Sequence, residues 1–500
     1  MIRARLALPL LLAALLEAAA CSKSPAAKAP PATTSPDASI AVTDDDAGAC
    51  TSPEFTGSPL GVHCNALVDT SGRTVLLHGV NARVSGIFDI TFDDGRLPLE
   101  TIPAFTIDDA TRIRALGFNA LRLPVDWSGI EPEADGGIVT AYLDRVAAVT
   151  AMCAKAGVFV LIDFHQDGYS KEVGEDGAPL WAIDPPPTQL LGGPLGDLGA
   201  RIESPQVQNA YVTFFASDAG APLRARYAQM AATVAARFAN DPAVVGFELY
   251  NEPIATADQA QALHEQMIPA LRTAAPSKLV FFEPPAFRNE IDSASLGSGS
   301  IGAGTVYAPH VYTLAFTNPD ESVTKDTYAH SNESARDEAD SWEAPLVITE
   351  YGYPPSSPNF MSWAKWQAEL EDEVKASSFF WVWKEESQGS WGFYDYDGDA
   401  GTLTERAAVV KAMTRARLEA VAGALVSVGY DEDAMTMTVT FDGSDAVHAP
   451  NVVSIGAGAS VPAAKWIATC DGKSVSTGDA DPLAIACGGA GAHTLVVSAK

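Results

Sequence analysis

Two glutamates in this chain each close an apolar run. Glu252 stands at the end of the apolar run in 244-VVGFELYNEP-253, and Glu350 stands at the end of the run in 345-PLVITEYG-352. An unpaired charge at the end of a buried strand is costly, so each carboxylate needs a partner or a chemical task. Hydrolysis of a glycosidic bond needs two carboxyl groups, one to protonate the leaving oxygen and one to attack the anomeric carbon or activate water. A separation of about 5–5.5 Å gives retained configuration, and about 6.5–9.5 Å gives inversion.

The elements that would position these glutamates are short apolar runs that alternate with helical patterns. Most runs are almost continuously apolar, as in parallel strands buried on both faces. Eight strand-and-helix repeats predict an α/β fold, a (β/α)8 TIM barrel, in which the carboxyl ends of the strands line the active site. The runs are 74–81, 118–124, 157–165, 244–252, 278–284, 304–312, 345–352 and 378–385.

Polar or aromatic residues stand at the end of every predicted strand. In a TIM barrel these side chains meet at one mouth, so the two glutamates are expected to face each other there. The strand-end residues are Asn81, Arg122, His165, Asp167, Asn251, Glu252, Glu283, His310, Tyr312, Glu350, Trp383 and Lys384.

The pattern changes near residue 418. Segments such as 434-AMTMTVTF-441 alternate apolar with polar or small residues, and Gly, Asp and Ser clusters separate them. Such alternation predicts a small antiparallel β-sandwich over 418–500, after a catalytic barrel domain over 51–417. The segment has no evident row of exposed aromatic residues, so we interpret it as a structural appendage.

The N-terminus resembles a targeting segment. A basic start and the apolar run 6–16 precede the small residues 18–20, which predicts a signal peptide over 1–20. The segment is similar to bacterial lipoprotein signals, in which the cysteine after the cleavage site, here Cys21, is lipidated. It departs from them at Ala18, where such signals usually carry Leu. The protein is therefore expected to be exported from a bacterial cell. It would then be either a membrane-anchored lipoprotein or an ordinary secreted protein. Residues 22–48 carry almost no large apolar side chains, which predicts a disordered tether over 21–50.

Composition excludes several classes of partner. The 500 residues carry a formal net charge of −31, which argues against nucleic acid and against direct binding to anionic membrane surfaces. Membrane association would come only through a lipid on Cys21. No C-x-x-C or H-E-x-x-H spacing indicates a metal. We therefore expect no metal or other cofactor, and a monomer.

Six cysteines are present in a chain for which export makes disulfides permissible. Near neighbours in sequence suggest the pairs Cys50–Cys64 and Cys470–Cys487, although sequence alone does not fix the connectivity. Cys153 lies in a helical pattern and is expected to be a buried free thiol.

The order and spacing of several motifs resemble glycoside hydrolase family 5, of clan A, over roughly residues 65–415. This resemblance implies a retaining mechanism, with Glu252 as general acid/base and Glu350 as nucleophile. It also implies that Asn251 holds the sugar 2-OH. The motifs are 118-FNALRLPVDW-127, 161-LIDFHQD-167, 249-LYNEP-253, 308-APHVY-312, 348-ITEYG-352 and 379-FFWVWK-384.

Further roles come from the same resemblance. Arg122 would lie beneath Glu350 and favour its ionised form, and Tyr312 would donate a hydrogen bond to it. His310 would shape the site near the acid/base, and Trp383 would form an apolar floor for the sugar ring.

The stretch 161-LIDFHQDGYS-170 is similar to the endoglycoceramidases within this family, which release an intact glycan from the ceramide of a glycosphingolipid. This similarity implies that His165 and Asp167 contact the sugar beside the scissile bond. Several endoglycoceramidases carry a Lys soon after G-V-N, where the nearest cation here is Arg83. This departure leaves both glucosyl and galactosyl linkages open.

The partner is therefore expected to be a glycolipid or glycan. The long insertion over 168–220 carries many apolar side chains, which would suit a lid over a lipid or simple packing on the barrel. The alternative enzyme is a family 5 β-glucosidase or endoglucanase that acts on steryl glucosides or soluble β-glucans. An alternative of another class is a non-catalytic, glycan-binding surface lipoprotein. The loss of either glutamate would favour this alternative, but both are present.

Overall fold

The computed structural model describes residues 54–292, 296–385, 391–397, 401–456 and 461–500. The predicted signal peptide and most of the region before the barrel, including Cys21 and Cys50, lie outside the described residues. Among the described residues, no helix is long and apolar enough to span a bilayer.

Nine parallel strands form the central sheet, in the order β10–β11–β12–β4–β5–β6–β7–β8–β9. β9 and β10 are two parts of one predicted strand, so the sheet closes as the predicted eight-stranded TIM barrel. A parallel bridge between Tyr307 and Leu346 lies at this closure. The strands are β4 (His78–Asn81), β5 (Ala120–Asp126), β6 (Phe159–His165), β7 (Val244–Glu248), β8 (Leu279–Phe282), β9 (Thr305–Tyr307), β10 (His310–Val311), β11 (Val347–Tyr351) and β12 (Ser377–Phe380).

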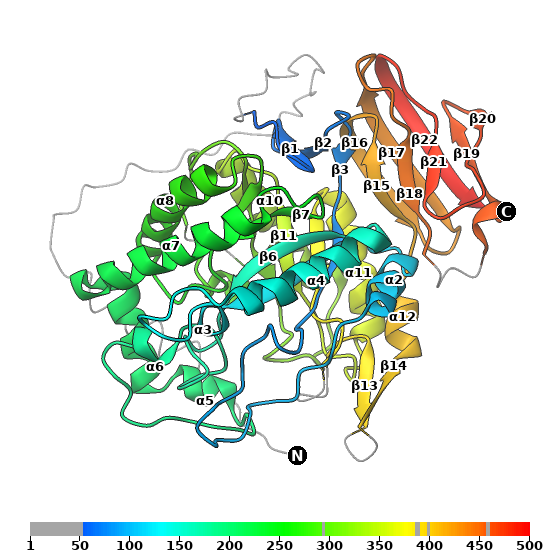
Figure 1. Cartoon of the computed structure of the whole chain (residues 1–500). Helices are drawn as coiled ribbons and strands as arrows, with labels where there is room; N and C mark the ends of the chain where they lie inside the picture. The colour runs from blue at the N-terminus through cyan, green and yellow to red at the C-terminus, as the bar shows by residue number, and fades with distance from the viewer. Residues whose placement is uncertain (1–53, 293–295, 386–390, 398–400, 457–460) are drawn as a thin grey trace, which may run out of the picture. The chain divides into compact units, whose positions relative to one another are not determined.

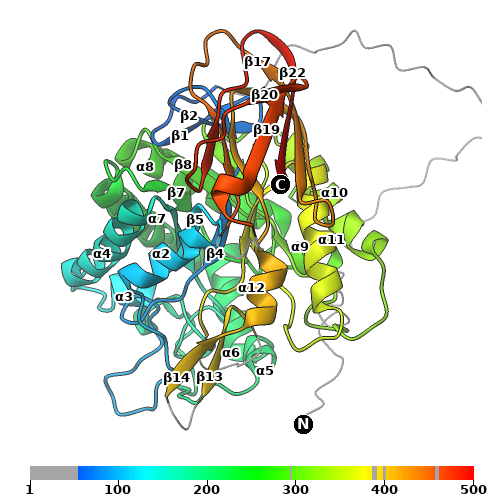
Figure 2. The same ribbon diagram turned by 90° about the vertical axis from the view of Figure 1, so that its right-hand side faces the viewer.

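Helices surround the sheet where the sequence predicts amphipathic segments, with short additional turns in the loops (Figures 1 and 2). α2 shows why one of them begins where it does, since Thr106 and Asp109 form a reciprocal capping box at its start. The helices are α2 (Ile107–Ala115), α3 (Trp127–Ile130), α4 (Thr140–Ala156), α5 (Leu198–Ile202), α6 (Pro205–Tyr211), α7 (Ala221–Phe238), α8 (Ala257–Ala274), α9 (Arg288–Ile291), α10 (Lys325–Ser341), α11 (Phe360–Glu373) and α12 (Ala407–Met413).

The period of two along each strand separates the inside of the barrel from its helical shell. In β5, Ala120 belongs to an inner apolar cluster, whereas Leu121 and Leu123 pack in the larger cluster with the helices. Arg122, the next inward position after Ala120, meets Glu248 of β7. The barrel therefore has an apolar layer below and a charged layer above it, at the carboxyl ends of the strands.

A second, antiparallel part contains two sheets that enclose a separate apolar core, as predicted for a β-sandwich. The prediction built this part from residues 418–500 alone. One of its sheets also contains strands that precede the barrel in the sequence, because Thr74–Val75 (β3) pairs with Arg417–Val421 (β15). The first sheet is β1 (Leu60–His63), β2 (Ala66–Asp69), β3 (Thr74–Val75), β15 (Arg417–Val421), β18 (Asn451–Ser454) and β21 (Leu483–Ile485). The second is β16 (Gly423–Asp431), β17 (Thr436–Gly443), β22 (Gly491–Ala499), β19 (Trp466–Cys470) and β20 (Lys473–Val475), and a separate hairpin is β13 (Tyr394–Asp397) with β14 (Thr402–Glu405).

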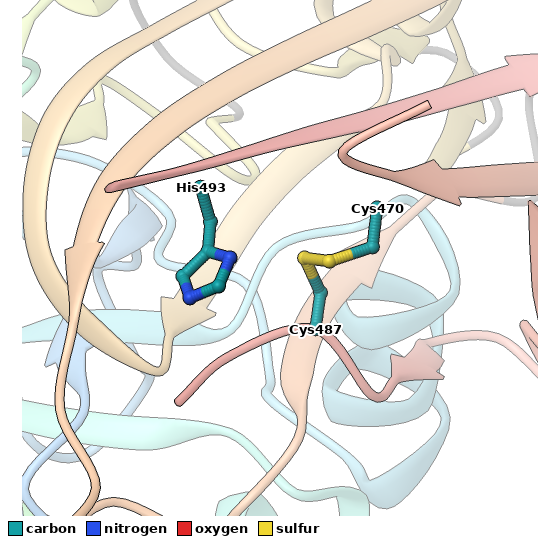
Figure 3. A group of neighbouring side chains, drawn as sticks. All are labelled: Cys470, Cys487 and His493. Atoms are coloured by element: carbon teal, nitrogen blue, oxygen red, sulfur yellow. A yellow bond between two sulfur atoms is a disulfide. The ribbon is translucent and has the colours of Figure 1, made fainter. Parts of the chain in front are cut away.

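Cys470 and Cys487 form the predicted disulfide, which joins the end of β19 to the segment after β21 (Figure 3). His493 lies beside the bridge (Figure 3). Its Nδ1 atom is 2.9 Å from a carboxylate oxygen of Asp471. The sulfur atoms of Cys470 and Cys487 are bonded to each other, so neither is a thiolate that could bind a metal. Cys153 is buried and free, as expected.

Candidate active site

Arg122 is the centre of the charged layer inside the barrel. Its guanidinium contacts Glu248 and Glu350, and lies 3.1 Å from a carboxylate oxygen of Asp163 and 3.6 Å from one of Glu283. Burial alone would lower the pKa of Arg122, but these carboxylates, Asp163 and Glu248 foremost, raise it well above the usual value. A fixed positive charge therefore lies beneath the mouth of the barrel.

Glu350 is held by two hydrogen-bond donors. Arg122 Nη1 donates to Oε1, and the Tyr312 hydroxyl donates to Oε2 at 2.7 Å. The register between β11 and β12 shifts between Ile348 and Tyr351, next to this glutamate. Glu350 is buried. Two donors aimed at its two oxygens stabilise a negative charge on this carboxylate.

Glu252 has a different setting. Its backbone φ of 44° lies in the left-handed region, which is unusual for a residue other than glycine and is often found at functional sites. The backbone N–H donates to Glu283 Oε2 at 3.0 Å, which holds this conformation. The side chain is 26% exposed, and Oε1 accepts a hydrogen bond of 3.0 Å from Asn289 Nδ2. Glu252 therefore reaches the solvent side of the charged layer.

The pKa values of the groups around Glu252 favour a proton on it. Burial, and next the charge of Asp167, raise the pKa of Glu252 to about 8. Burial also lowers the pKa of His310, whose Nδ1 lies 2.8 Å from Glu252 Oε1. A neutral imidazole beside a protonated carboxyl group is the result expected near neutral pH.

The two glutamates face each other across the mouth. One side-chain oxygen of each, together with a ring nitrogen of His310, forms a group whose atoms all lie within 4.8 Å of one another. His310 Nδ1 also lies 3.6 Å from Glu350 Oε2. This short separation is well below the about 6.5–9.5 Å of inverting glycosidases and agrees better with the about 5–5.5 Å of retaining ones.

His165 and Asp167 lie together at the end of β6. His165 Nδ1 is 2.6 Å from Asp163 Oδ2, and its Nε2 is 3.8 Å from Asp167 Oδ2. Burial opposes a charge on the imidazole, but the carboxylates of Asp163 and Asp176 outweigh it and raise the pKa of His165 well above its usual value. The Trp381 ring stacks on the imidazole, with centroids 5.8 Å apart and planes 10° apart.

Asn251 is fixed from two sides. Its Oδ1 accepts a hydrogen bond from Arg122 Nη2 at 2.8 Å, which directs its Nδ2 atom away from the arginine. Gln166, the middle residue of the H-Q-D motif, donates to the backbone carbonyls of Asn251 and Glu252 at 2.7 and 3.1 Å. The predicted residues Arg122, Asn251, Glu252, His310, Tyr312 and Glu350 therefore form one contact network, and His165 and Asp167 lie beside it.

The structure does not bring Trp383 to this network. Trp383 is 1% exposed, packs on Phe393 and Tyr394, and donates from Nε1 to Asp109 at 3.1 Å. β12 ends at Phe380, so Trp381 is the first residue beyond the strand and takes the position that the sequence assigned to Trp383. This is a correction to the predicted site.

The apolar insertion also differs from a simple lid. Tyr211, Phe214 and Phe215 are buried and pack with Tyr250, behind the catalytic turn. The Tyr211 hydroxyl donates to the side chain of Gln166. The aromatic part of the insertion therefore supports the site from inside. Leu180, Leu190 and Val212 are its large apolar side chains with high exposure.

Sequence reasoning missed four residues of the site. Glu248 lies within β7 and accepts a hydrogen bond from Arg122. The alternation of side chains along β7 could have shown that Glu248 points inward. Asn289 lies in the four-residue helix α9, and Asp176 and Trp381 lie in loops, so no periodicity signals any of the three. Asp176 is fully buried, and its carboxylate oxygens have no hydrogen-bond donor among the described residues.

Three groups of two acidic residues and one histidine lie close enough together to hold an ion among the described residues, two of them around His310 and one around His165. Around His310, Arg122 already supplies a positive charge to Glu248, Glu283 and Glu350. A cation there would be repelled by the guanidinium, so these carboxylates fit an arginine-centred network better than a metal site.

The barrel and the paired glutamates define a class of protein. The sequence profile of the cellulase family (glycosyl hydrolase family 5) matches residues 99–387, and the chain belongs to this family.

Among individual relatives, endoglycoceramidase I of Rhodococcus hoagii (strain 103S) is 31% identical over 268 residues, which are 50% of this chain and 51% of that protein. Ergosteryl-beta-glucosidase of Saccharomyces cerevisiae (strain ATCC 204508 / S288c) is 34% identical over 148 residues, 25% of this chain and 19% of that protein. The chain thus spans about half the length, or less, of these curated relatives. The solved structure of endo-glycoceramidase II from Rhodococcus sp. with ganglioside GM3 shares the fold, with a TM-score of 0.72 at 24% identity, covering 87% of this chain and 99% of that one.

Proposed function

We propose that this protein is a retaining glycoside hydrolase that cleaves the β-glycosidic bond between the glycan and the ceramide of glycosphingolipids. One observation carries the proposal: one side-chain oxygen of Glu252 lies within 4.8 Å of one of Glu350, and Arg122 and Tyr312 donate hydrogen bonds to Glu350 and not to Glu252. Such a pair suits double displacement through a covalent intermediate better than direct attack by water.

In the first step, a Glu350 oxygen attacks the anomeric carbon while the protonated Glu252 gives its proton to the glycosidic oxygen. The bond from the anomeric carbon to that oxygen breaks, and the aglycone leaves as an alcohol. In the second step, the Glu252 carboxylate takes a proton from water, and the water oxygen displaces Glu350 from the sugar. The enzyme returns to its starting state, and the sugar keeps its configuration.

The surroundings of each glutamate support this assignment of roles. Arg122 and Tyr312 stabilise the charged form that a nucleophile needs. Burial raises the pKa of Glu252 to about 8, so it holds a proton at neutral pH, as a general acid needs. Asn251, fixed by Arg122, is the proposed partner of the sugar 2-OH.

The two sides of the mouth differ in polarity, which suggests where each half of a glycolipid lies. His165, Asp167 and Trp381 form a polar side with one aromatic face, suited to a sugar. Phe316, on the segment after β10, is 61% exposed and contacts the rings of Tyr312 and Trp391 at centroid distances of 5.0 and 5.3 Å. This exposed ring beside the nucleophile's partner is the proposed contact for an apolar aglycone.

The named relatives favour the same substrate class. One is called an endoglycoceramidase, and the solved neighbour holds a ganglioside. A second candidate is cleavage of a steryl glucoside, which the similarity to an ergosteryl-beta-glucosidase favours. Both aglycones are apolar, so Phe316 does not distinguish them. A soluble β-glucan is a third substrate to test.

Export and anchoring remain predictions from sequence. A signal peptide over 1–20 and a lipid on Cys21 would place the barrel outside the cytoplasm, at a membrane, on a tether. We also propose that the strands before the barrel belong with the sandwich of 418–500, because they complete one of its sheets.

The test is incubation of the mature protein with glucosyl- and galactosyl-linked glycosphingolipids, steryl glucosides and soluble β-glucans, with mass spectrometry of the products. Intact oligosaccharide with free ceramide is the expected result, and the panel shows which linkage is cut. Release of glucose from steryl glucosides, without ceramide release, would contradict the proposed substrate and favour the second candidate. The Glu350→Gln variant is the matched control for contaminating activity.

A further inference from the structure

A second buried arginine lies beside the mouth of the barrel. Arg83 follows β4, and its side chain is 2% exposed. Its guanidinium meets Glu100, Glu175 and Glu385 at 2.9, 3.1 and 2.8 Å. These four residues are here called the Arg83 clamp. Three separate connections supply them, namely the β4–α2 loop, the β6–α5 insertion and the segment after β12, so the clamp ties three loops together.

Two of the three loops of the clamp carry a side chain of the proposed sugar side. The backbone N–H groups of Glu175 and Asp176 both donate to the carbonyl of Asp167, at 2.8 and 3.2 Å. Glu385 lies four residues after Trp381. Any movement of the clamped carboxyl groups would therefore shift Asp167 and Trp381.

Arg83 also lies behind the two rings that flank His165. Its Cζ atom is 5.2 Å from the centroid of Phe88 and 6.0 Å from that of Trp381. Both rings have their centroids 5.8 Å from that of His165. Arg83 is thus one layer away from the sugar side, in contact with the groups that orient it and too deeply buried to bind a sugar hydroxyl itself.

We propose that Arg83 is a positioning residue that sets the affinity for the glycan through Asp167, His165 and Trp381. The inference rests on the proposed function, because it takes these three residues as the glycan side. A planar guanidinium presents several donors in a fixed fork and can hold three carboxyl groups from three directions, whereas a lysine ammonium is a point charge on a flexible stem. Lysine at this position would keep the charge and lose the geometry.

The clamp carries more carboxyl groups than cations. Burial raises the pKa of Glu175 to about 8 and also raises that of Glu385, so protons as well as the arginine compensate the charge. Removing the arginine altogether would leave three buried carboxyl groups together, which would destabilise the fold. The informative change is therefore Arg83→Lys.

The experiment measures lactose binding by calorimetry in the Glu350→Gln background, which removes turnover, and kcat and KM for an aryl β-lactoside with Glu350 intact. Arg83→Lys is expected to weaken lactose binding and to raise KM by about tenfold or more, with a smaller change in kcat, because small displacements of positioning groups have large effects. An unchanged dissociation constant and KM, with only a lower melting temperature, would overturn the proposal.

Arg114→Lys is the matched control. Arg114 of α2 makes a two-pronged ion pair with Glu419 of β15, at 2.5 and 3.1 Å, and contacts no residue of the sugar side among the described bonds. It should lower the melting temperature and leave lactose binding within about twofold. An equal loss of binding in this control would show a general structural effect and contradict the proposal.

A second variant covers the case in which Arg83→Lys does not fold. Arg83→Met combined with Glu100→Gln, Glu175→Gln and Glu385→Gln removes all four ionisable groups of the clamp, and the same weakening of lactose binding is expected. Absence of lactose binding in the parent protein would contradict both the clamp and the glycan site. Lactose binding without ceramide release would contradict only the proposed substrate.

Discussion

Glu350 and Glu252 follow the same pattern in the sequence and end in opposite surroundings. Glu350 accepts hydrogen bonds from a buried arginine and a tyrosine hydroxyl. Glu252 reaches toward solvent in a left-handed turn, beside a histidine whose pKa burial lowers. Arg122 touches the first and not the second. Arg122 therefore distinguishes the surroundings of two identical side chains, in the direction that the proposed roles require.

The two glutamates are also held differently: among the described bonds, both oxygens of Glu350 accept hydrogen bonds, whereas only Oε1 of Glu252 does, and the backbone of Glu252 is fixed as well. A nucleophile must keep its charge and position, and two donors do this for Glu350. An acid/base must gain and lose a proton in each cycle, so a polar, partly exposed side chain is suitable. Glu283 fixes the backbone of Glu252 instead of its carboxyl group.

The Glu350→Gln variant gives the strongest test of the difference. We expect kcat to fall by a factor of about 10⁴ or more, because removal of a nucleophile typically has this size of effect. The melting temperature should change little, since the amide can still accept a hydrogen bond from Tyr312. Steady-state kinetics on an aryl glycoside checks this, and activity like that of the wild type would remove Glu350 as nucleophile.

The Glu252→Gln variant should lose about 10²–10⁴-fold in kcat on substrates with poor leaving groups, the usual contribution of general acid–base catalysis. The loss in the first step should be far smaller with a dinitrophenyl leaving group, which needs no proton. Equal losses on both substrates would contradict the acid role.

The pH profile tests the same assignment in the unaltered protein. Glu252 must be protonated to act as acid, and its pKa is raised to about 8, mainly by burial. On a substrate with a poor leaving group, kcat/KM should therefore fall as pH rises through about 8, and Glu252→Gln should lack this alkaline limb on the same substrate. An alkaline limb that persists in the variant would assign it to another group.

Tyr312→Phe removes one of the two donors to Glu350. A hydrogen bond to a charged group contributes about 1.5–3 kcal/mol, so kcat/KM should fall about 10- to 100-fold. Tyr328→Phe is the control, because the Tyr328 hydroxyl contacts only Tyr353 among the described bonds, at 3.2 Å. An equal loss of activity in both variants would show that Tyr312 has no special role.

The smallest effect on activity is expected at Trp383. Trp383→Phe should destabilise the fold by about 1–3 kcal/mol and leave KM nearly unchanged, because this side chain is in the core. Trp381→Phe should raise KM and leave the melting temperature nearly unchanged. Thermal unfolding and kinetics on the two variants check this contrast, and a raised KM in Trp383→Phe would restore its predicted role.

The sequence predicted most of the barrel because buried parallel strands leave continuous apolar runs. It did not predict that β3 would leave the run 74–81 and pair with β15, since pairing between residues so distant in sequence leaves no local pattern. The break between β9 and β10 was also not visible. A run of apolar letters does not show where a strand bends.

At the site, motif order identified the residues that project from strands or follow them directly. Arg122, His165 and Glu350 lie where the alternation of their strands places them. The error at Trp383 arose because both tryptophans of 381-WVW-383 fit an apolar strand, and only the end of β12 at Phe380 decides between them. Arg83 was recognised as a cation, but its three partners lie in loops whose approach the sequence does not encode locally.

The most direct test of the central claim is to trap the intermediate. A 2-deoxy-2-fluoro-β-glycoside with a dinitrophenyl leaving group slows the second step, so a retaining enzyme accumulates its glycosyl adduct, which peptide mass spectrometry can locate. We predict one adduct, on the peptide that contains Glu350, and none in Glu350→Gln. An adduct on Glu252, or turnover to a product of inverted configuration without any adduct, would contradict the assignment.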